Sequence, residues 1–505
     1  MTLNTTPTGS IMTDDAIARR NRTALILLLA AVFVVFLNET MMTVALPKIQ
    51  EALRIDATQG QWLTTAFALT MAVVIPTTGW LLQRLNTRPV FIVALVTFSI
   101  GTLIAAMSPV FEVLVVGRVV QAIGTAIMMP LMMTTVMTIV APQDRGRIMG
   151  RISIVMSVAP AVGPTVSGAL LQVLPWQGLF WVMLPIALIM LGIGIRFVPN
   201  VTETRAAPLD VLSVILSAIA FSSLVYGLSG IGSSALGSVP VAPWIPITFG
   251  LVVLAIFIWR QIRLQRTDSA LLDLRTFLSR NFTFSVALLA VAMLAMFGVI
   301  ILIPQFARYT LGLDVLAVGA IMLPGSLLMG LLGPTIGRLY DKFGPRPLIL
   351  PGSLAVSAAL WTFALALGEG SSWLVLLGGF IVLSLGLAFL FTPLFSVSLG
   401  SLKPHLYSYG SATVATLQQV AGAAGIALFV ALYATGLAGA GNLDPEQPSA
   451  AEAAAGAHMA FIAGGFISLA VIALTFFIHR LPAEAGGHGE WQAEGENAEA
   501  ETVTP

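Results

Sequence analysis

Two charged residues stand apart in this sequence because each lies inside a long apolar run. Glu39 occurs within residues 24–46, and Arg118 occurs within residues 111–139. A carboxylate inside a membrane-spanning helix costs about 2.5–3.5 kcal/mol on insertion scales, and such residues usually line a polar path. Burial favours the neutral carboxyl, whereas a nearby cation favours the ionised form. The two residues therefore indicate proton-linked chemistry inside a membrane.

The elements that must position these residues are membrane-spanning helices. Only 9% of the 505 residues are charged and 57% are hydrophobic, whereas about 25% of a soluble protein is charged. This composition excludes a soluble protein and predicts an all-α polytopic membrane protein. Apolar runs long enough to span a bilayer occur at 24–46, 62–82, 89–107, 111–139, 148–173, 179–197, 209–228, 241–261, 282–304, 316–337, 347–367, 373–394, 411–437 and 458–478.

The basic residues predict how these fourteen spans are oriented. If the N-terminus is cytoplasmic, 20 of the 24 Lys and Arg residues fall on the cytoplasmic side, three fall outside and Arg118 lies within a span. Cytoplasmic loops of membrane proteins carry such an excess of positive charge. We therefore expect both termini to be cytoplasmic, with residues 1–23 as an N-terminal segment. Residues 481–505 are acidic, and we expect them to form a disordered cytoplasmic tail.

A sequence repeat links two of the predicted cytoplasmic turns. Residues 76–89 read PTTGWLLQRLNTRP and residues 334–347 read PTIGRLYDKFGPRP, with six of the fourteen positions identical at a constant offset of 258. Asn86 and Gly344 occupy equivalent positions. Both residue types tolerate a left-handed backbone, so this pair is like for like.

The repeat also predicts how the chain is divided. Equivalent turns that lie eight spans apart indicate two pseudo-symmetric six-helix bundles, at 24–200 and 282–480, with two linker helices inserted at 201–281. Two related halves around a central site are typical of transporters. The alternative is that two unrelated hairpins between membrane helices happen to look alike.

The second copy of the repeat resembles the signature turn of the major facilitator superfamily. The residues that carry this resemblance are Gly337, Leu339, Asp341, Lys342, Gly344, Arg346 and Pro347. The arrangement of six, two and six spans resembles the 14-span drug:proton antiporter branch of that superfamily. In the first copy, Gln83 stands where the family usually has Asp, which puts the charge interaction of that turn in doubt.

Three further segments share this resemblance. Arg118-Val-Val-Gln121-Ala-Ile-Gly124 resembles the Arg-x-x-Gln-Gly motif of the family, with Ala122 in place of a Gly. The segment from Ala159 to Gly168 resembles the antiporter motif, with Ala159 and Ser167 in place of two Gly. The run from Leu37 to Pro47 resembles the lincomycin and multidrug exporters.

We expect proton coupling or substrate binding at Glu39, Asn38, Arg118 and Gln121. Glu39 lies roughly 22 Å from the start of its span and Arg118 about 9 Å from the start of its own, counted at 1.5 Å per residue from opposite sides. The two therefore share a similar depth. The family resemblance implies that both of their spans line the N-terminal side of a cavity, so the pair could approach each other directly or through Gln121 or Asn38. The alternative is a Glu–Arg pair that only holds two helices together.

Two further sets of residues follow from the motifs. Pro160 and Pro164, flanked by Gly163 and Gly168, predict a bent helix whose small residues permit close packing; such a bend would seal the cavity, and the alternative is an ordinary kinked span. The turn residues are expected to form a cytoplasmic gate of charge contacts that break and remake, or else only to signal topology. They are Gly79, Arg84, Arg88, Gly337, Asp341, Lys342 and Arg346.

The resemblance implies a proton-coupled antiporter in a bacterial cytoplasmic membrane that exports lipophilic, often cationic compounds by alternating access. The partners expected are these substrates, protons and the lipid bilayer, with no nucleic acid, and the protein is expected to act as a monomer. No cofactor or metal is expected, since the sequence has no cysteine and its four histidines are scattered, and the proton gradient would supply the energy. The alternatives are a selective exporter of one metabolite, antibiotic or lipid, and a membrane receptor or enzyme.

Overall fold

The chain folds into a bundle of long helices. A computed structural model describes residues 14–201, 204, 208–236, 241–441 and 448–478, and within these ranges fourteen helices are long and apolar enough to cross a membrane. This confirms the predicted fold class. The helices are α1 (Asp14–Leu53), α2 (Ala57–Arg84), α3 (Thr87–Ala106), α4 (Phe111–Ile139), α5 (Arg145–Val173), α6 (Gln177–Phe197), α7 (Val211–Leu236), α8 (Trp244–Leu264), α9 (Arg280–Tyr309), α10 (Val315–Phe343), α11 (Arg346–Ala366), α12 (Trp373–Gly400), α13 (Tyr407–Gly439) and α14 (Ala450–Thr475).

Several helices begin or end outside the predicted spans, because hydropathy locates the apolar part of a helix and not its ends. α14 begins at Ala450, eight residues before the predicted start, and Ser449 and Glu452 form a capping box there. α1 begins at Asp14, so part of the predicted N-terminal segment is helical. The predicted disordered tail, 481–505, lies outside the described residues.

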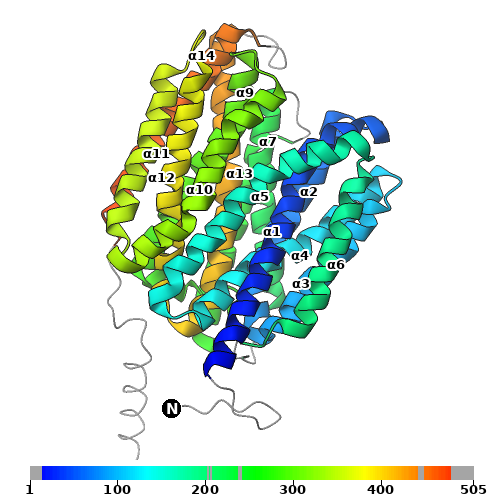
Figure 1. The fold of residues 1–505 in the computed structure, drawn as a ribbon, viewed down its shortest axis with the longest axis vertical. Helices are drawn as coiled ribbons and strands as arrows, with labels where there is room; N and C mark the ends of the chain where they lie inside the picture. The colour runs from blue at the N-terminus through cyan, green and yellow to red at the C-terminus, as the bar shows by residue number, and fades with distance from the viewer. Residues whose placement is uncertain (1–13, 202–203, 205–207, 237–240, 442–447, 479–505) are drawn as a thin grey trace, which may run out of the picture.

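The helix contacts group α1–α6 into one bundle and α9–α14 into a second, and these two groups lie side by side in Figure 1. In the first bundle α1 packs against α4, α5 and α6, while α3 packs against α4 and α6. In the second bundle α9 packs against α12, α13 and α14, while α11 packs against α12 and α14. We call the end of the molecule where α1 begins and α14 ends the terminal face, and the other end the opposite face.

The two most extensive helix crossings between the bundles are that of α5 with α10 and that of α2 with α13. At the first crossing the backbones touch through glycines near the terminal face. A Cβ atom on Gly333 would lie 2.3 Å from the Gly150 carbonyl oxygen, and a Cβ on Gly337 would lie 2.0 Å from the Gly146 carbonyl oxygen. Small residues four positions apart on both helices therefore permit this close approach.

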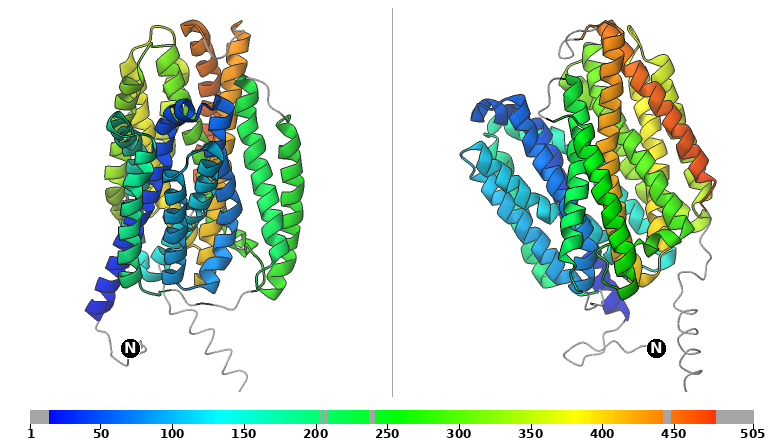
Figure 2. Two further views of the ribbon diagram at one scale, coloured as in Figure 1. Left: turned by 90° about the vertical axis from the view of Figure 1, so that its right-hand side faces the viewer. Right: turned by 180° about the vertical axis from the view of Figure 1, so that it is seen from behind.

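The inserted helices α7 and α8 stand as a separate pair at one side (Figure 2). α7 packs against α2 and α13, whereas α8 packs mainly against α7. At the terminal face Arg260 donates two hydrogen bonds of 2.7 Å to Asp210, and these lower the pKa of Asp210 to about 2. Gln261 donates to Ser213 and accepts from the backbone N–H groups of Leu271 and Leu272, which fixes the pair to the segment before α9.

The glycine contacts predict a difference between two Gly→Ala substitutions. Gly333→Ala places a methyl group against the Gly150 carbonyl and should lower the melting temperature of the purified protein by several degrees, because overpacking costs about 1–3 kcal/mol. Gly378→Ala, in α12, meets nothing within 4 Å and should leave the melting temperature unchanged or raise it, since Ala favours helix by about 1 kcal/mol. Equal effects of the two substitutions would contradict the described crossing.

Candidate functional site

Arg118 on α4 is the most deeply buried charged side chain described, with 1% of its surface exposed. Its Nη1 donates to Gln121 Oε1 at 2.6 Å, and Gln121 Nε2 donates to Thr102 Oγ1 at 2.8 Å. Thr102 then donates to the Phe98 carbonyl on α3 at 2.7 Å. The guanidinium also lies over the Phe67 ring of α2, with 4.0 Å between Cζ and the ring centre. Three helices therefore hold Arg118 in one position.

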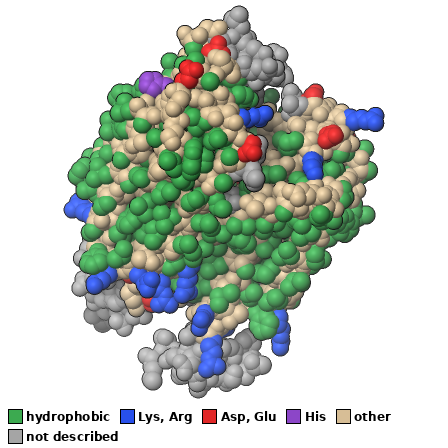
Figure 3. Space-filling model, turned by 45° about the horizontal axis from the view of Figure 1, so that its top comes forward, with side chains coloured by type: hydrophobic (Ala, Val, Ile, Leu, Met, Phe, Trp, Pro, Cys, Tyr) green, Lys and Arg blue, Asp and Glu red, His purple; other side chains and the backbone are tan. Residues whose placement is uncertain are grey.

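Glu39 on α1 lies close enough to Arg118 for the two charges to act on each other. Among the described residues, however, its carboxylate has no hydrogen bond and no ion pair, and the side chain is only partly buried. Neighbouring Asn38 is 4% exposed, and its Oδ1 is buried without a donor. The structure therefore brings Glu39 and Arg118 together, but neither Asn38 nor Gln121 links them by a hydrogen bond. Figure 3 shows the molecule hollowed between the bundles at the opposite face.

The antiporter-motif segment of α5 packs directly against α1 beside Glu39. The helix continues without interruption through Pro160 and Pro164. A Cβ on Gly163 would lie 2.0 Å from the hydroxyl oxygen of Thr40, and Thr40 donates across the contact to the Ala159 carbonyl at 3.3 Å. The predicted close packing is therefore found at Gly163. It is not found at Gly168, where a Cβ would meet nothing within 4 Å, and Ser167 instead makes the next contact by donating to the Met41 carbonyl at 2.9 Å.

At the terminal face Asp341 joins the two bundles. Its two carboxylate oxygens accept hydrogen bonds of 2.8 Å from the backbone N–H groups of Gly146 and Arg147, in the first turn of α5. These N–H groups have no partner within their own helix, and the helix N-terminus favours a negative charge. A carboxylate from one bundle thus caps a helix of the other, next to the Gly337 contact.

The equivalent region of the first copy is built differently. Gln83 Nε2 donates to the His405 carbonyl at 3.0 Å, so an amide crosses to the second bundle where the other copy has a carboxylate. Gly79 faces Tyr409 of α13. The two equivalent positions also differ in backbone: Gly344 has φ of +80°, but Asn86 has φ of −64° and is the extended N-cap residue of α3. The difference arises because Asn86 begins its helix directly, whereas Gly344 ends α10.

Among the described residues, the other four residues of the predicted gate form no hydrogen bond or ion pair with the opposite bundle. Arg84 is exposed, and Lys342 lies over the Phe343 ring of its own helix. Arg88 donates its backbone N–H to Asn200, and Arg346 donates to the Ile478 carbonyl, each within its own bundle. Of the predicted gate residues, Asp341 therefore joins the bundles through its carboxylate and Gly337 through a backbone contact, whereas the sequence predicted a set of charge pairs.

Several residues that join the bundles were not predicted. The hydroxyl oxygens of Thr134 and Ser411 lie 2.7 Å apart, as do those of Ser153 and Thr392. Arg145 donates to the hydroxyl of Tyr407 at 3.3 Å. Hydroxyl residues scattered in apolar helices have no spacing that marks them, so only their three-dimensional contacts reveal these links.

The fold and site define a transporter of the major facilitator superfamily. Residues 28–426 match the model of that family, and the chain belongs to it. The chain is 37% identical to the lincomycin resistance protein LmrB of Listeria monocytogenes, over 90% of this chain and 95% of that protein. It is 34% identical to LmrB of Bacillus subtilis (91% and 96%) and 26% identical to the multidrug efflux pump LfrA of Mycolicibacterium smegmatis (87% of each).

Solved structures have the same fold at low sequence identity. The human organic anion transporter MFSD10 superposes with a TM-score of 0.62 at 17% identity, covering 90% of this chain and 99% of that one. The proton:xylose symporter XylE superposes with a TM-score of 0.61 at 13% identity, covering 92% and 97%. The chain is thus a multi-pass protein of a bacterial plasma membrane, with the fold of a transporter.

The Asp341 contact predicts that neighbouring residues of the signature turn differ in effect. Asp341→Ala removes both acceptors from the start of α5 and should loosen the terminal face, whereas Lys342→Ala should not. Because the protein has no cysteine, a single Ser411→Cys variant can report the opening. Its labelling by a maleimide should be several-fold faster in the Asp341→Ala background and unchanged in the Lys342→Ala background. Equal labelling rates in all three proteins would refute a closing role for Asp341.

Proposed function

We propose that this protein is a proton-coupled antiporter that exports drugs or other lipophilic compounds, many of them cationic, by alternating access. The observation that carries the proposal is the state of Glu39, a carboxylate with no hydrogen-bond or ion-pair partner among the described residues, close to the fixed charge of Arg118. A carboxyl group without such a partner can take up a proton when this side of the protein is accessible. It can later release that proton as a bound cation or a change of access favours the ionised form.

Two lines of support lead from this site to export. Relatives that match nearly the whole chain are named lincomycin resistance protein and multidrug efflux pump. The bundles are also held together at the terminal face by Asp341, Gln83 and two hydroxyl pairs, while the opposite face is hollowed (Figure 3). This arrangement suits one of the two states that alternating access requires, with the terminal face closed.

The orientation and the partners belong to the same proposal. The positive charge at the terminal face supports a cytoplasmic location for both termini, and with that orientation the hollow faces outward in this state. The protein acts as a monomer, needs no cofactor and takes its energy from the proton gradient. The second candidate is a selective exporter of one metabolite, antibiotic or lipid. It is favoured by the side-chain amide oxygen of Asn38, which is buried and has no hydrogen-bond donor within the described part of the chain, since a buried polar atom of this kind rewards one substrate geometry.

The central test replaces the carboxylate. Glu39→Gln keeps the size of the side chain but cannot release a proton, so drug-evoked proton movement in proteoliposomes should be lost. Glu112→Gln serves as the matched control, because Glu112 is exposed in the first turn of α4, and its proton movement should match the wild type. A cationic dye, a neutral antibiotic and lincomycin are compared. Full proton-driven export by Glu39→Gln would eliminate the proposed role of this residue, and a response to one compound alone would favour the selective exporter.

A second test concerns alternating access. The Ser153→Cys/Thr392→Cys pair replaces hydroxyl oxygens that lie 2.7 Å apart across the bundle interface, and a disulfide of about 2.05 Å should form there. The disulfide should block transport until it is reduced. In the control pair, Ser357→Cys/Ser468→Cys, the hydroxyls lie 2.8 Å apart within the second bundle, so the disulfide should leave transport intact. Transport by the oxidised interface pair would contradict alternating access through this interface.

A further inference from the structure

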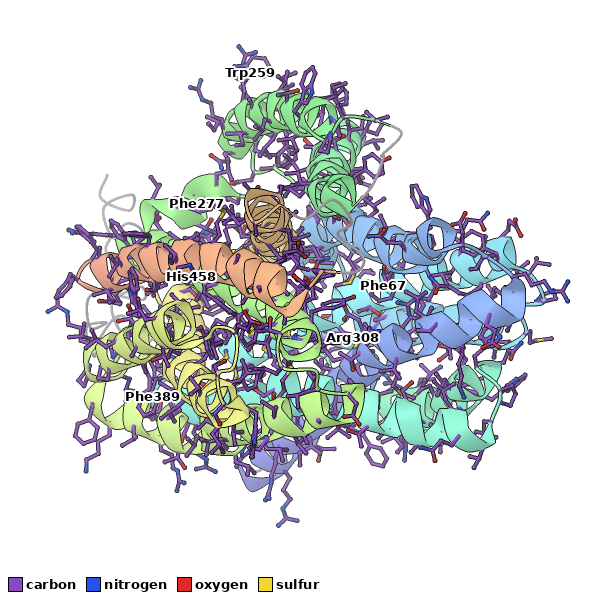
Figure 4. The ribbon with its side chains drawn as sticks, turned by 90° about the horizontal axis from the view of Figure 1, so that it is seen from above. Phe67, Trp259, Phe277, Arg308, Phe389 and His458 are labelled. Carbon is purple, nitrogen blue, oxygen red and sulfur yellow. The ribbon has the colours of Figure 1, made fainter. Side chains whose placement is uncertain are left out.

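Phe67 has a place in the site that no motif indicates. It lies on α2 near the centre of the molecule, as the view from above shows (Figure 4). Its side chain is 3% exposed and carries the Arg118 guanidinium on its ring at 4.0 Å. It also packs with Met71 and Ile75 of its own helix, Ala122 and Ala126 of α4, and Ala415 of the second bundle.

The position of Arg118 on this ring poses a physical problem. A buried guanidinium and a nearby carboxylate attract each other strongly, because a low-dielectric interior screens charge poorly. Arg118 nevertheless donates to Gln121 and stacks on Phe67, and among the described residues it forms no ion pair with Glu39. Its Nε is buried and finds no acceptor in the described ranges, so the guanidinium lacks one possible hydrogen bond in this position. Some interaction must offset the attraction toward Glu39.

We propose that Phe67 is a positioning residue that holds Arg118 away from Glu39 and so keeps the carboxylate free to exchange protons and meet substrate. This role rests on the proposed function, because a free Glu39 matters only if this carboxylate couples protons to transport. Cation–π attraction grows when the cation is desolvated, which is the situation of Arg118. Gln121 holds one edge of the guanidinium and the Phe67 ring holds its face, so the two together fix its direction.

The charges around this group make the consequence specific. Among the described residues, the charge that acts on Glu39 is that of Arg118, and the charge that acts on Arg118 is that of Glu39. If the ring is lost, no other charge competes for the released guanidinium. Arg118 then pairs with ionised Glu39, and the ion pair resists both protonation and displacement by a cationic substrate. An aliphatic side chain of similar bulk maintains the packing but provides no such ring.

The experiment compares Phe67→Leu, Phe67→Trp and the control Met71→Leu, which alters the same apolar cluster one turn away without touching the cation–π contact. The primary readout is labelling of Glu39 by a hydrophobic carbodiimide, which reacts with protonated carboxyl groups, quantified by mass spectrometry at a fixed pH. Phe67→Leu should lower the labelling about tenfold, as expected when an opposite charge pairs with a carboxylate. Phe67→Trp and Met71→Leu should label like the wild type.

A double variant separates pairing from disturbed packing. Phe67→Leu/Arg118→Gln should regain the labelling lost in Phe67→Leu, because no guanidinium remains to pair with Glu39. Unchanged labelling in Phe67→Leu, or persistent loss in the double variant, would overturn the positioning role. Melting temperatures confirm that each variant is folded, and Phe67→Trp supplies a second comparison if Phe67→Leu is unstable. Labelling does not require transport. If the variants label as expected but the wild-type protein moves no protons, the proposed function is rejected and the positioning role of Phe67 is retained.

Discussion

The structure depends on how one buried cation is held. Arg118 lies inside the first bundle, where an unsolvated charge is expensive unless it is hydrogen-bonded or paired. The protein satisfies it with the amide of Gln121 and the ring of Phe67, and the amide continues through Thr102 into α3. The charge is thereby fixed to a rigid set of three helices. Glu39 lies on a different helix, α1, and its side chain is partly exposed. The two opposite charges are therefore close, but among the described residues they form no hydrogen bond or ion pair with each other.

Polar contacts also decide how firmly the two bundles are joined. The related crossings α5–α10 and α2–α13 use different chemistry: the first presses glycine backbones together under the Asp341 cap, and the second relies on Gln83 and looser contacts around Gly79. A carboxylate on two helix N–H groups is a charge-assisted contact, and an amide on one carbonyl is a neutral one, about half as strong. The closed terminal face is therefore held unequally, and the α5–α10 crossing carries more of its stability.

The sequence predicts the fold better than it predicts the site. Fourteen apolar runs and one repeat were sufficient for the helices and the two bundles, because membrane burial imposes both length and composition. Glu39 and Arg118 were conspicuous for the same reason: a charge in an apolar run has few explanations. Phe67, Ser153 and Thr392 were not, since an aromatic or hydroxyl side chain in such a run is ordinary and acquires meaning only from its neighbour. The backbone of Asn86 also depended on context, namely the helix that begins there.

The contacts of the inserted helices α7 and α8 predict how this pair moves when the terminal face opens. α7 touches α2 of one bundle and α13 of the other, and these helices must separate if the terminal face opens. α7 therefore cannot keep both contacts. Arg260 of α8 binds Asp210 at the start of α7, and Gln261 binds the pair to the backbone of residues 271–272, directly before α9. Towards α2, by contrast, Phe221 and Val225 of α7 pack in an apolar cluster with Ala72. Apolar surfaces slide more easily than a hydrogen-bonded network breaks, so the pair should travel with the second bundle and shift along α2.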